Sequence, residues 1–267
     1  MPAPPALFAS LLAGALTFGV PLGETAVDSS PPPSPPEDSA RAVVVELFTS
    51  EGCSSCPPAD RLLRSLVKQA RADDRPVYAL SFHVDYWNRL GWTDPYSDAS
   101  YSRRQQRYVS ALGVDAYTPQ IVVNGSEVMV GSRSRSVRQA ITAALDDPSA
   151  VRVMLDASPA GDSLQLRYRL LGTLPPRGEV HLAIVERGLS QSVPRGENAG
   201  RTLRHANVVR QFLTCRARRR GSVLLPIPGV VDREQASVIA YVQAPSMEIH
   251  GAARVDVPEE DPTAASK

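Results

Sequence analysis

The sequence has few of the residues that usually carry chemistry, with three cysteines, four histidines and two tryptophans in 267 residues. It also lacks an excess of charge, because 29 basic and 28 acidic residues leave a formal net charge of +1. This balance argues against a nucleic acid or an anionic membrane as the partner. We interpret the one dense basic run, Arg216 to Arg220, as a solvated turn.

The apolar stretch at residues 6–20, ALFASLLAGALTFGV, is too short to span a bilayer comfortably. Polar, proline-rich sequence follows it, which is typical of a signal peptide, although the first basic residue is Arg41. We therefore expect a signal peptide at residues 1–23, with an uncertain cleavage site, and a Pro/Ser-rich linker at 24–40. The alternative is an uncleaved membrane anchor. Export would place the protein in the periplasm or outside the cell, where cysteines meet oxidising conditions.

The remaining chain is long enough for two ordinary domains and shows no internal repeat. Residues 41–147 predict the order strand, helix, strand, helix, strand, strand, helix, with a hairpin turn at Asn124-Gly125. From residue 148 to 257 short alternating strands are separated by Gly and Pro turns, which predicts an all-β, sandwich-like domain. We expect residues 258–267 to form a disordered tail.

Cys53 and Cys56 form a C-x-x-C pair between the first expected strand and the first expected helix. A cysteine at a helix N-terminus is near unpaired amides and the positive end of the dipole, which favour the nucleophilic thiolate. Cys53 is the candidate attacking thiol, expected to face solvent, and Cys56 is the candidate resolving thiol. In the thioredoxin fold a cis-proline lies against such cysteines, and Thr118-Pro119 is placed for this substrate-docking role. The element order and these two motifs predict an α/β thioredoxin-like domain with a mixed sheet.

Four segments carry a resemblance to a known family: VVELFTSEGCSSCPPAD, ALSFHVDYWNRLGW, YTPQIVVNG and RGENAGRTLRHANVVR. They resemble the uncharacterised secreted proteins of domain-of-unknown-function family 1223, across roughly residues 42–257. The resemblance implies a thioredoxin-like fold and export, with Cys53 and Cys56 as redox cysteines and Pro119 on the substrate side. The dipeptide Ser54-Ser55 differs from the Gly-Pro pair of thioredoxin, so the redox potential is not carried over.

Three further residues are possible auxiliaries of the cysteine pair. Glu46, in an apolar strand, is a candidate proton acceptor for Cys56, or else one half of a structural ion pair. His83 and Asp85 follow the second strand at the sheet edge where open α/β sheets place their sites. His83 is a candidate for lowering the pKa of Cys53, or is simply hydrogen-bonded.

Other residues have less specific signals. Trp87 and Trp92 are candidates for an apolar substrate rim, although core packing is the favoured interpretation. Polar residues cluster around Gly200 in the sequence: Glu197, Asn198, Arg201, His205, Asn207 and Arg210. We favour a role for this cluster in bracing a domain interface over a role in substrate contact. Cys215 is alone, and burial as a small apolar residue is its expected role.

The favoured function is an exported thiol–disulfide oxidoreductase acting on thiols or disulfides of other exported proteins. It is expected to need no cofactor, to bind no nucleic acid, and to have no membrane contact beyond an uncleaved anchor. One alternative is a metal-delivery protein that binds copper or zinc through Cys53, Cys56 and His83. Another is a noncatalytic interaction module in which the two cysteines form a structural disulfide.

Overall fold

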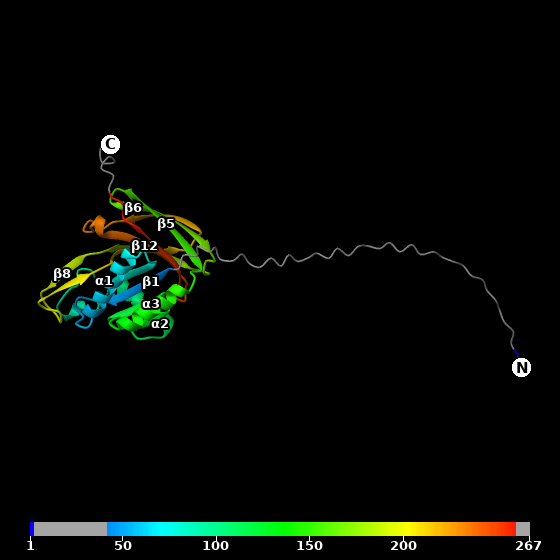
Figure 1. Ribbon diagram of the computed structural model, residues 1–267, viewed down its shortest axis with the longest axis horizontal. Helices are drawn as coiled ribbons and strands as arrows, with labels where there is room; N and C mark the ends of the chain where they lie inside the picture. Colours follow the sequence, from blue (N-terminus) through cyan, green and yellow to red (C-terminus); the bar gives the residue numbers. More distant parts are fainter. Residues whose placement is uncertain (3–41, 260–267) are drawn as a thin grey trace, which may run out of the picture. The chain divides into compact units, whose positions relative to one another are not determined.

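The computed structural model describes residues 1–2 and 42–259. The predictions of a signal peptide, a linker and a tail beyond residue 259 therefore lie outside the described residues. Residues 42–259 fall within one compact unit and form a mixed α/β structure with a large mixed sheet, two smaller sheets and few helices (Figure 1). No helix in the described part of the chain is both long and apolar enough to cross a bilayer.

The first half alternates strands and helices, and the second half consists almost entirely of strands. The first half comprises β1 (Val43–Thr49), α1 (Pro57–Ala72), β2 (Val77–His83), the 3-10 turn η1 (Asn88–Leu90), α2 (Ala99–Leu112), β3 (Gln120–Val123), β4 (Glu127–Val130) and α3 (Ser134–Asp146). The second half comprises β5 (Val151–Ala160), β6 (Ser163–Gly172), β7 (Glu179–Glu186), β8 (Leu189–Val193), β9 (Arg201–His205), β10 (Val208–Arg216), β11 (Arg220–Pro226), η2 (Arg233–Gln235), β12 (Ala236–Gln243) and β13 (Ile249–Asp256).

Local sequence explains the element order of the first half, which is the predicted one. Helix α1 begins with two prolines, where the missing N–H groups forfeit few helical hydrogen bonds. The side chain of Asp98 caps α2 by accepting a hydrogen bond from the backbone N–H of Ser100. Asn124 and Gly125 both have positive φ, 45° and 76°, as the tight turn between β3 and β4 requires.

The large sheet has the strand order β13-β12-β7-β10-β2-β1-β3-β4. Strands β1 and β2 are parallel, whereas β3 pairs antiparallel with both β1 and β4. Because side chains alternate along a strand, Val45 and Leu47 of β1 face a core formed with α1 and α3. Phe48 faces the opposite core, which contains the tyrosines of α2. Helices thus cover both faces of this part of the sheet.

The expected boundary at residues 147–148 does not separate two domains. Strand β10, from the second half, joins β2, from the first half, through the register pair Val208–Ser81. Beside it, the Ser81 N–H donates to the Asn207 carbonyl at 2.8 Å, and the Asn207 side-chain amide donates to the Ala79 carbonyl at 2.8 Å. The two-domain prediction differs from the structure because β10 pairs with β2 and makes the large sheet continuous across residues 147–148.

The β-rich second half is a sandwich in which one layer is shared with the first half. Strands β5, β6 and β11 form a three-stranded sheet with the order β11-β6-β5. Its inner face packs on β7, β12 and β13 through a core that includes Leu164, Leu166, Leu170, Leu182 and Val238. The prediction of a β-rich second half is therefore right, but the second layer of the sandwich is the large sheet.

Candidate functional site

The two cysteines lie at the carboxyl end of β1, where the chain turns into α1. Cys53 and Cys56 form a disulfide with their Cα atoms 5.4 Å apart, and Cys56 is the residue that precedes the helix. Both cysteines are 0% exposed, whereas Ser54 and Ser55 are exposed. The expectation of a solvent-facing Cys53 is therefore wrong for this oxidised state, in which the two serines form the outer surface of the motif.

The loop before β3 meets the motif as expected from the sequence. The peptide bond between Thr118 and Pro119 is cis. Ser55 Oγ lies 3.3 Å from Cys53 Sγ and donates to the Thr118 carbonyl at 3.4 Å. The indole N–H of Trp87 donates to Thr118 Oγ1 at 2.8 Å, so this half-buried tryptophan packs on the core and holds the loop. The cysteine pair and the proline loop are neighbours.

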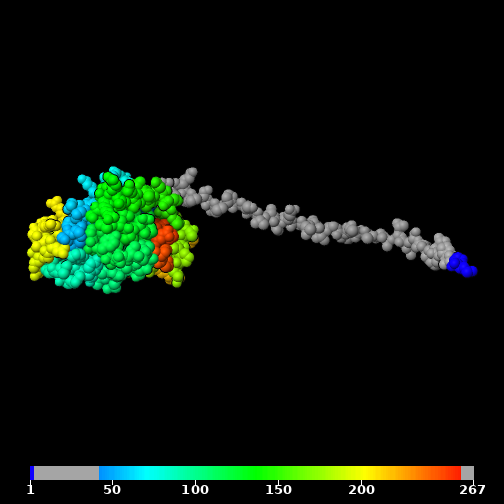
Figure 2. Space-filling model, turned by 90° about the horizontal axis from the view of Figure 1, so that it is seen from below, coloured from blue at the N-terminus to red at the C-terminus, as the bar shows by residue number. Residues whose placement is uncertain are grey.

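A segment of the second half braces the motif from the other side. In Figure 2 the yellow atoms, which belong to the region of β8 and β9, lie beside the blue atoms of the region that includes β1 and the cysteine motif. Glu197 Oε2 accepts hydrogen bonds from the Ser54 N–H at 3.1 Å and from Ser54 Oγ at 2.7 Å. The buried side-chain amide of Asn198 donates to the carbonyls of Glu51, at 2.8 Å, and Cys53, at 2.9 Å. The hydrogen bonds from Ser54 lower the pKa of Glu197. The polar group around Gly200 therefore acts here as a brace.

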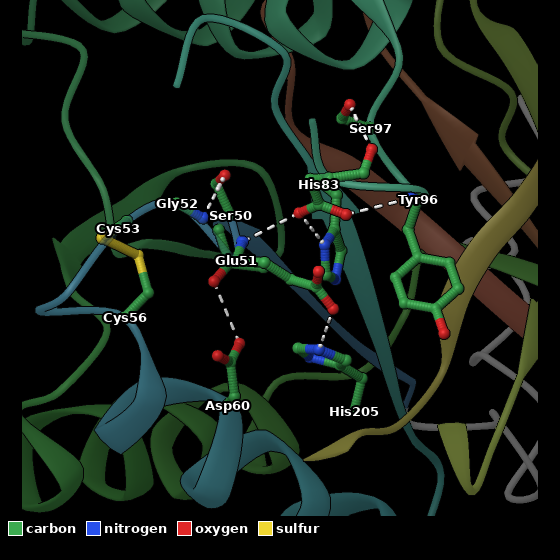
Figure 3. Close-up of polar contacts among 12 residues, drawn as sticks. Ser50, Glu51, Gly52, Cys53, Cys56, Asp60, His83, Tyr96, Ser97 and His205 are labelled. Atoms are coloured by element: carbon green, nitrogen blue, oxygen red, sulfur yellow. Dashed lines mark hydrogen bonds and ion pairs between the residues drawn. A yellow bond between two sulfur atoms is a disulfide. The ribbon is translucent and has the colours of Figure 1, made fainter. Parts of the chain in front are cut away.

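Beneath the motif two histidines and two carboxylates form a buried network (Figure 3). His83 Nδ1 lies 2.7 Å from Asp94 Oδ2, which also accepts the Glu51 N–H at 2.8 Å. His205 Nε2 lies 3.1 Å from Glu51 Oε1, and the two imidazole rings are 4.8 Å apart, edge to face. Among the described residues, His83 Nε2 and His205 Nδ1 have no hydrogen-bond partner. One nitrogen of each ring is therefore left without a fixed role.

The charges in this network shift one another's protonation. Burial lowers the pKa of His83, but the charge and hydrogen bond of Asp94, together with the charges of Asp60 and Glu51, outweigh burial, and the pKa of His83 is raised overall. Burial raises the pKa of Asp94, but the charge and hydrogen bond of His83, together with hydrogen bonds from the Glu51 and Tyr96 N–H groups, outweigh burial, and the pKa of Asp94 is lowered. His83 therefore has Asp94 as its hydrogen-bond partner. Of the two interpretations of His83, the structure favours the hydrogen-bonded residue over a direct neighbour of Cys53.

Asp60 is a site residue that the sequence reasoning missed. It lies four residues after Cys56 on α1, so the two side chains share one face of the helix (Figure 3). It is 5% exposed, and the Thr49 hydroxyl donates to it at 3.0 Å. Burial raises the pKa of Asp60, and the nearby histidines only partly offset this effect. The sequence does indicate this residue, because Asp60 is a carboxylate on the apolar face of an amphipathic helix.

Two of the expected auxiliary residues lie elsewhere. Glu46 pairs with Arg104 of α2 through hydrogen bonds of 2.8 and 2.9 Å, and both residues are buried on the far face of the sheet. The structural ion pair, one of its two interpretations, is therefore the one observed. Asp85 accepts a hydrogen bond of 2.5 Å from the Ser102 hydroxyl and anchors the start of α2.

The other candidates have structural contacts. Trp92 donates its indole N–H to Glu51 Oε2 at 2.8 Å, so it supports the buried network. Cys215 is half-buried, unpaired, and 3.9 Å from the hydroxyl of Tyr168. Within residues 1–2 and 42–259, no group of three His, Cys, Asp or Glu side chains is arranged to hold a metal ion. The alternative interpretation of Cys53, Cys56 and His83 as metal ligands thus has no support among these residues in the oxidised protein.

Comparison with known proteins places this arrangement among uncharacterised relatives. Residues 44–243 match the family model described as a protein of unknown function (DUF1223). The X-ray crystal structure of an Agrobacterium tumefaciens protein, a structural-genomics target, is similar with a TM-score of 0.64 and 28% sequence identity, covering 84% of this chain and 98% of that one. A hypothetical protein from Pyrococcus horikoshii matches with a TM-score of 0.22 and 6% identity, over 40% of this chain and 87% of that one, which is too weak to interpret. No curated protein matches.

Proposed function

Since the chain belongs to the DUF1223 family of proteins of unknown function, its activity has to be argued from the site, and we propose an exported thiol–disulfide oxidoreductase. The observation that carries this proposal is the Cys53–Cys56 disulfide at the start of α1, in contact with the cis Thr118–Pro119 loop. The substrates are thiols or disulfides of other exported proteins. The location is the periplasm or the exterior, as the apolar amino-terminal stretch and the proline-rich tract suggest.

The proposal includes a thioredoxin-like fold for residues 43–146. Its support is the strand order β2-β1-β3-β4, with β1 and β2 parallel and β3 antiparallel, together with helices on both faces of the sheet. In such a sheet, the carboxyl end of the first strand places the cysteine pair at a helix N-terminus. There the helix dipole and free amides stabilise a thiolate.

The chemistry is two successive thiol–disulfide exchanges. In the reduced protein the Cys53 thiolate attacks a substrate disulfide, forming a mixed disulfide and releasing one substrate thiolate. The Cys56 thiol then loses its proton and attacks Cys53 Sγ, which releases the second substrate thiolate. Two electrons pass from the cysteine pair to the substrate, and the reverse sequence oxidises a substrate dithiol. Asp60, with its raised pKa and its place one turn from Cys56, accepts and returns the Cys56 proton.

Access to the disulfide requires a local movement, because both cysteines are fully buried. The segment carrying Glu197 and Asn198 makes four hydrogen bonds to the backbone and side chain of the residues around Cys53. We assign the opening of this segment as the step that exposes Cys53 to a substrate. The brace therefore influences the rate of exchange as well as the stability of the loop.

The test separates the roles of the two cysteines in the compartment where the protein resides. Cys56→Ser leaves the attacking thiol without its resolving partner, so disulfide-linked adducts with other proteins accumulate on a non-reducing gel. Cys53→Ser is the matched control and gives no adducts. The reduction potential of the Cys53–Cys56 pair then indicates the direction of electron transfer. A value of about −270 mV indicates a reductase, and a value of about −120 mV indicates an oxidant. If wild type exchanges with neither a model disulfide nor a dithiol, and Cys56→Ser traps nothing, the pair is a structural disulfide.

A further inference from the structure

The outer face of the three-stranded sheet β5-β6-β11 is not covered by any described part of the chain. Its inner face contributes to the sandwich core, so the alternate residues of each strand point outward. Three large apolar side chains lie on this outward set: Met154 is 41% exposed, Leu171 is 40% exposed and Leu224 is 58% exposed. They come from three different strands, so the exposed apolar groups extend across the whole sheet face.

Arginines lie on the same outward face as these apolar side chains. Arg169 of β6 lies directly opposite Arg220 of β11 in the strand register, and Arg167 lies two residues before Arg169 on the same face. Like charges placed opposite each other on a sheet destabilise it. The single carboxylate in the register, Asp156, lies opposite Arg167. The face therefore keeps a local positive charge, which the net charge of +1 conceals.

The same face is hollowed. An open depression of about 600 Å³ is lined by residues of all three strands, including Met154, Arg167, Arg169 and Arg220. The turn that leads into β11 adds the exposed Arg218 and Arg219 at one end. The basic run expected to be only a solvated turn is thus continuous with a basic and apolar sheet face.

We propose that this face docks the protein on a bilayer that contains anionic phospholipid. Guanidinium groups bind lipid phosphates through paired hydrogen bonds. Apolar side chains on the same face enter the boundary between the headgroups and the acyl chains. A soluble polyanion complements the arginines but leaves Leu171 and Leu224 without a partner in water. The presence of both kinds of side chain on one face therefore fits a membrane surface. The inference uses no residue of the cysteine site and stands independently of the redox activity.

The experiment compares variants of the full chain, so that the apolar amino-terminal stretch contributes equally to every sample. Sedimentation with vesicles of phosphatidylcholine containing phosphatidylglycerol is compared with vesicles of phosphatidylcholine alone. The test variant removes three charges of the face, with Arg167→Gln, Arg169→Gln and Arg220→Gln combined. The matched control removes three exposed charges elsewhere, with Lys68→Gln, Arg103→Gln and Arg135→Gln combined.

Wild type and the control variant bind the anionic vesicles, and added salt weakens this binding. The test variant loses roughly 100-fold in affinity, since each arginine near an anionic surface contributes about fivefold. A second variant, Leu171→Ser with Leu224→Ser, weakens vesicle binding several-fold but leaves binding to soluble inorganic polyphosphate unchanged. Equal binding of wild type and the test variant overturns the proposal. So does a leucine variant that binds vesicles like wild type, which would identify a general polyanion site.

Discussion

The buried Glu46–Arg104 pair allows a decisive prediction, because sequence reasoning left its role open between catalysis and structure. Both carboxylate oxygens of Glu46 bind the Arg104 guanidinium. The hydroxyl of Tyr241 donates to Glu46 Oε1 at 2.8 Å, and that of Tyr108 donates to Oε2. All four side chains are almost completely buried. The carboxylate therefore has partners for both oxygens, and none of them is a cysteine.

Glu46→Gln preserves the shape of this side chain and removes its charge. Burial lowers the pKa of Arg104, but Glu46 and the phenolic groups raise it further, so the guanidinium stays charged. The substitution leaves that charge buried without its counterion, which costs about 3–5 kcal/mol of unfolding free energy. For a chain of this size each kcal/mol lowers the melting temperature by about 2–4 °C, so we expect a decrease of roughly 6–20 °C.

Urea and thermal unfolding of wild type and Glu46→Gln measure this effect. The control Glu46→Leu with Arg104→Met removes both charges and regains part of the lost stability, because no unpaired charge remains. The exchange rate per folded molecule stays within about twofold of wild type, since Glu46 is not the proton acceptor. The reasoning is refuted if Glu46→Gln is as stable as wild type and instead slows exchange.

Three further predictions concern the site and its location. Asn198→Ala removes both hydrogen bonds to the loop around Cys53, so dithiothreitol should reduce the disulfide about tenfold faster at 25 °C; an unchanged rate contradicts the opening step. The raised pKa of His83 contributes stability that is complete below pH 6.5 and lost as the pH rises through the folded-state pKa. Unfolding free energies from pH 6 to 9 should therefore fall more steeply for wild type than for His83→Gln, and parallel curves exclude this linkage. Export predicts a mature amino terminus between about residues 20 and 40, and an intact chain in the cytosol by mass spectrometry excludes it.

The sequence predicts well those parts of the fold that local patterns determine. The buried strand β1, the apolar stripe of α1 and the Asn124-Gly125 turn each have a signature within a few residues of chain. The same holds for the cysteine pair before a helix and for the cis bond before Pro119. These features depend on backbone preferences and periodicity, so they can be predicted without knowledge of contacts between distant parts of the chain.

The features that were missed depend on contacts between residues far apart in the chain. The pairing of β10 with β2, and the contact of the loop between β8 and β9 with the cysteine motif, join segments more than 100 residues apart in the chain, so no local pattern predicts them. The burial of Cys53 depends on packing that only the assembled unit provides, and Asn198 reaches it across 145 residues of sequence. The role of Asp60 is hidden in the sequence because a carboxylate near a helix N-terminus is favourable there whether or not it is buried.

These long-range contacts show why the second half is part of the site. Without β10, strand β2 would be an edge with unpaired backbone groups, which proteins normally cover or pair. Without β12, Glu46 would lose Tyr241, and its partner Arg104 would lose Gln243. Without the β8–β9 hairpin, Glu51 would lose His205 and the cysteine loop would lose its brace. The cysteine pair is therefore braced and shielded by the β-rich half, which is a structural component of the proposed exchange site.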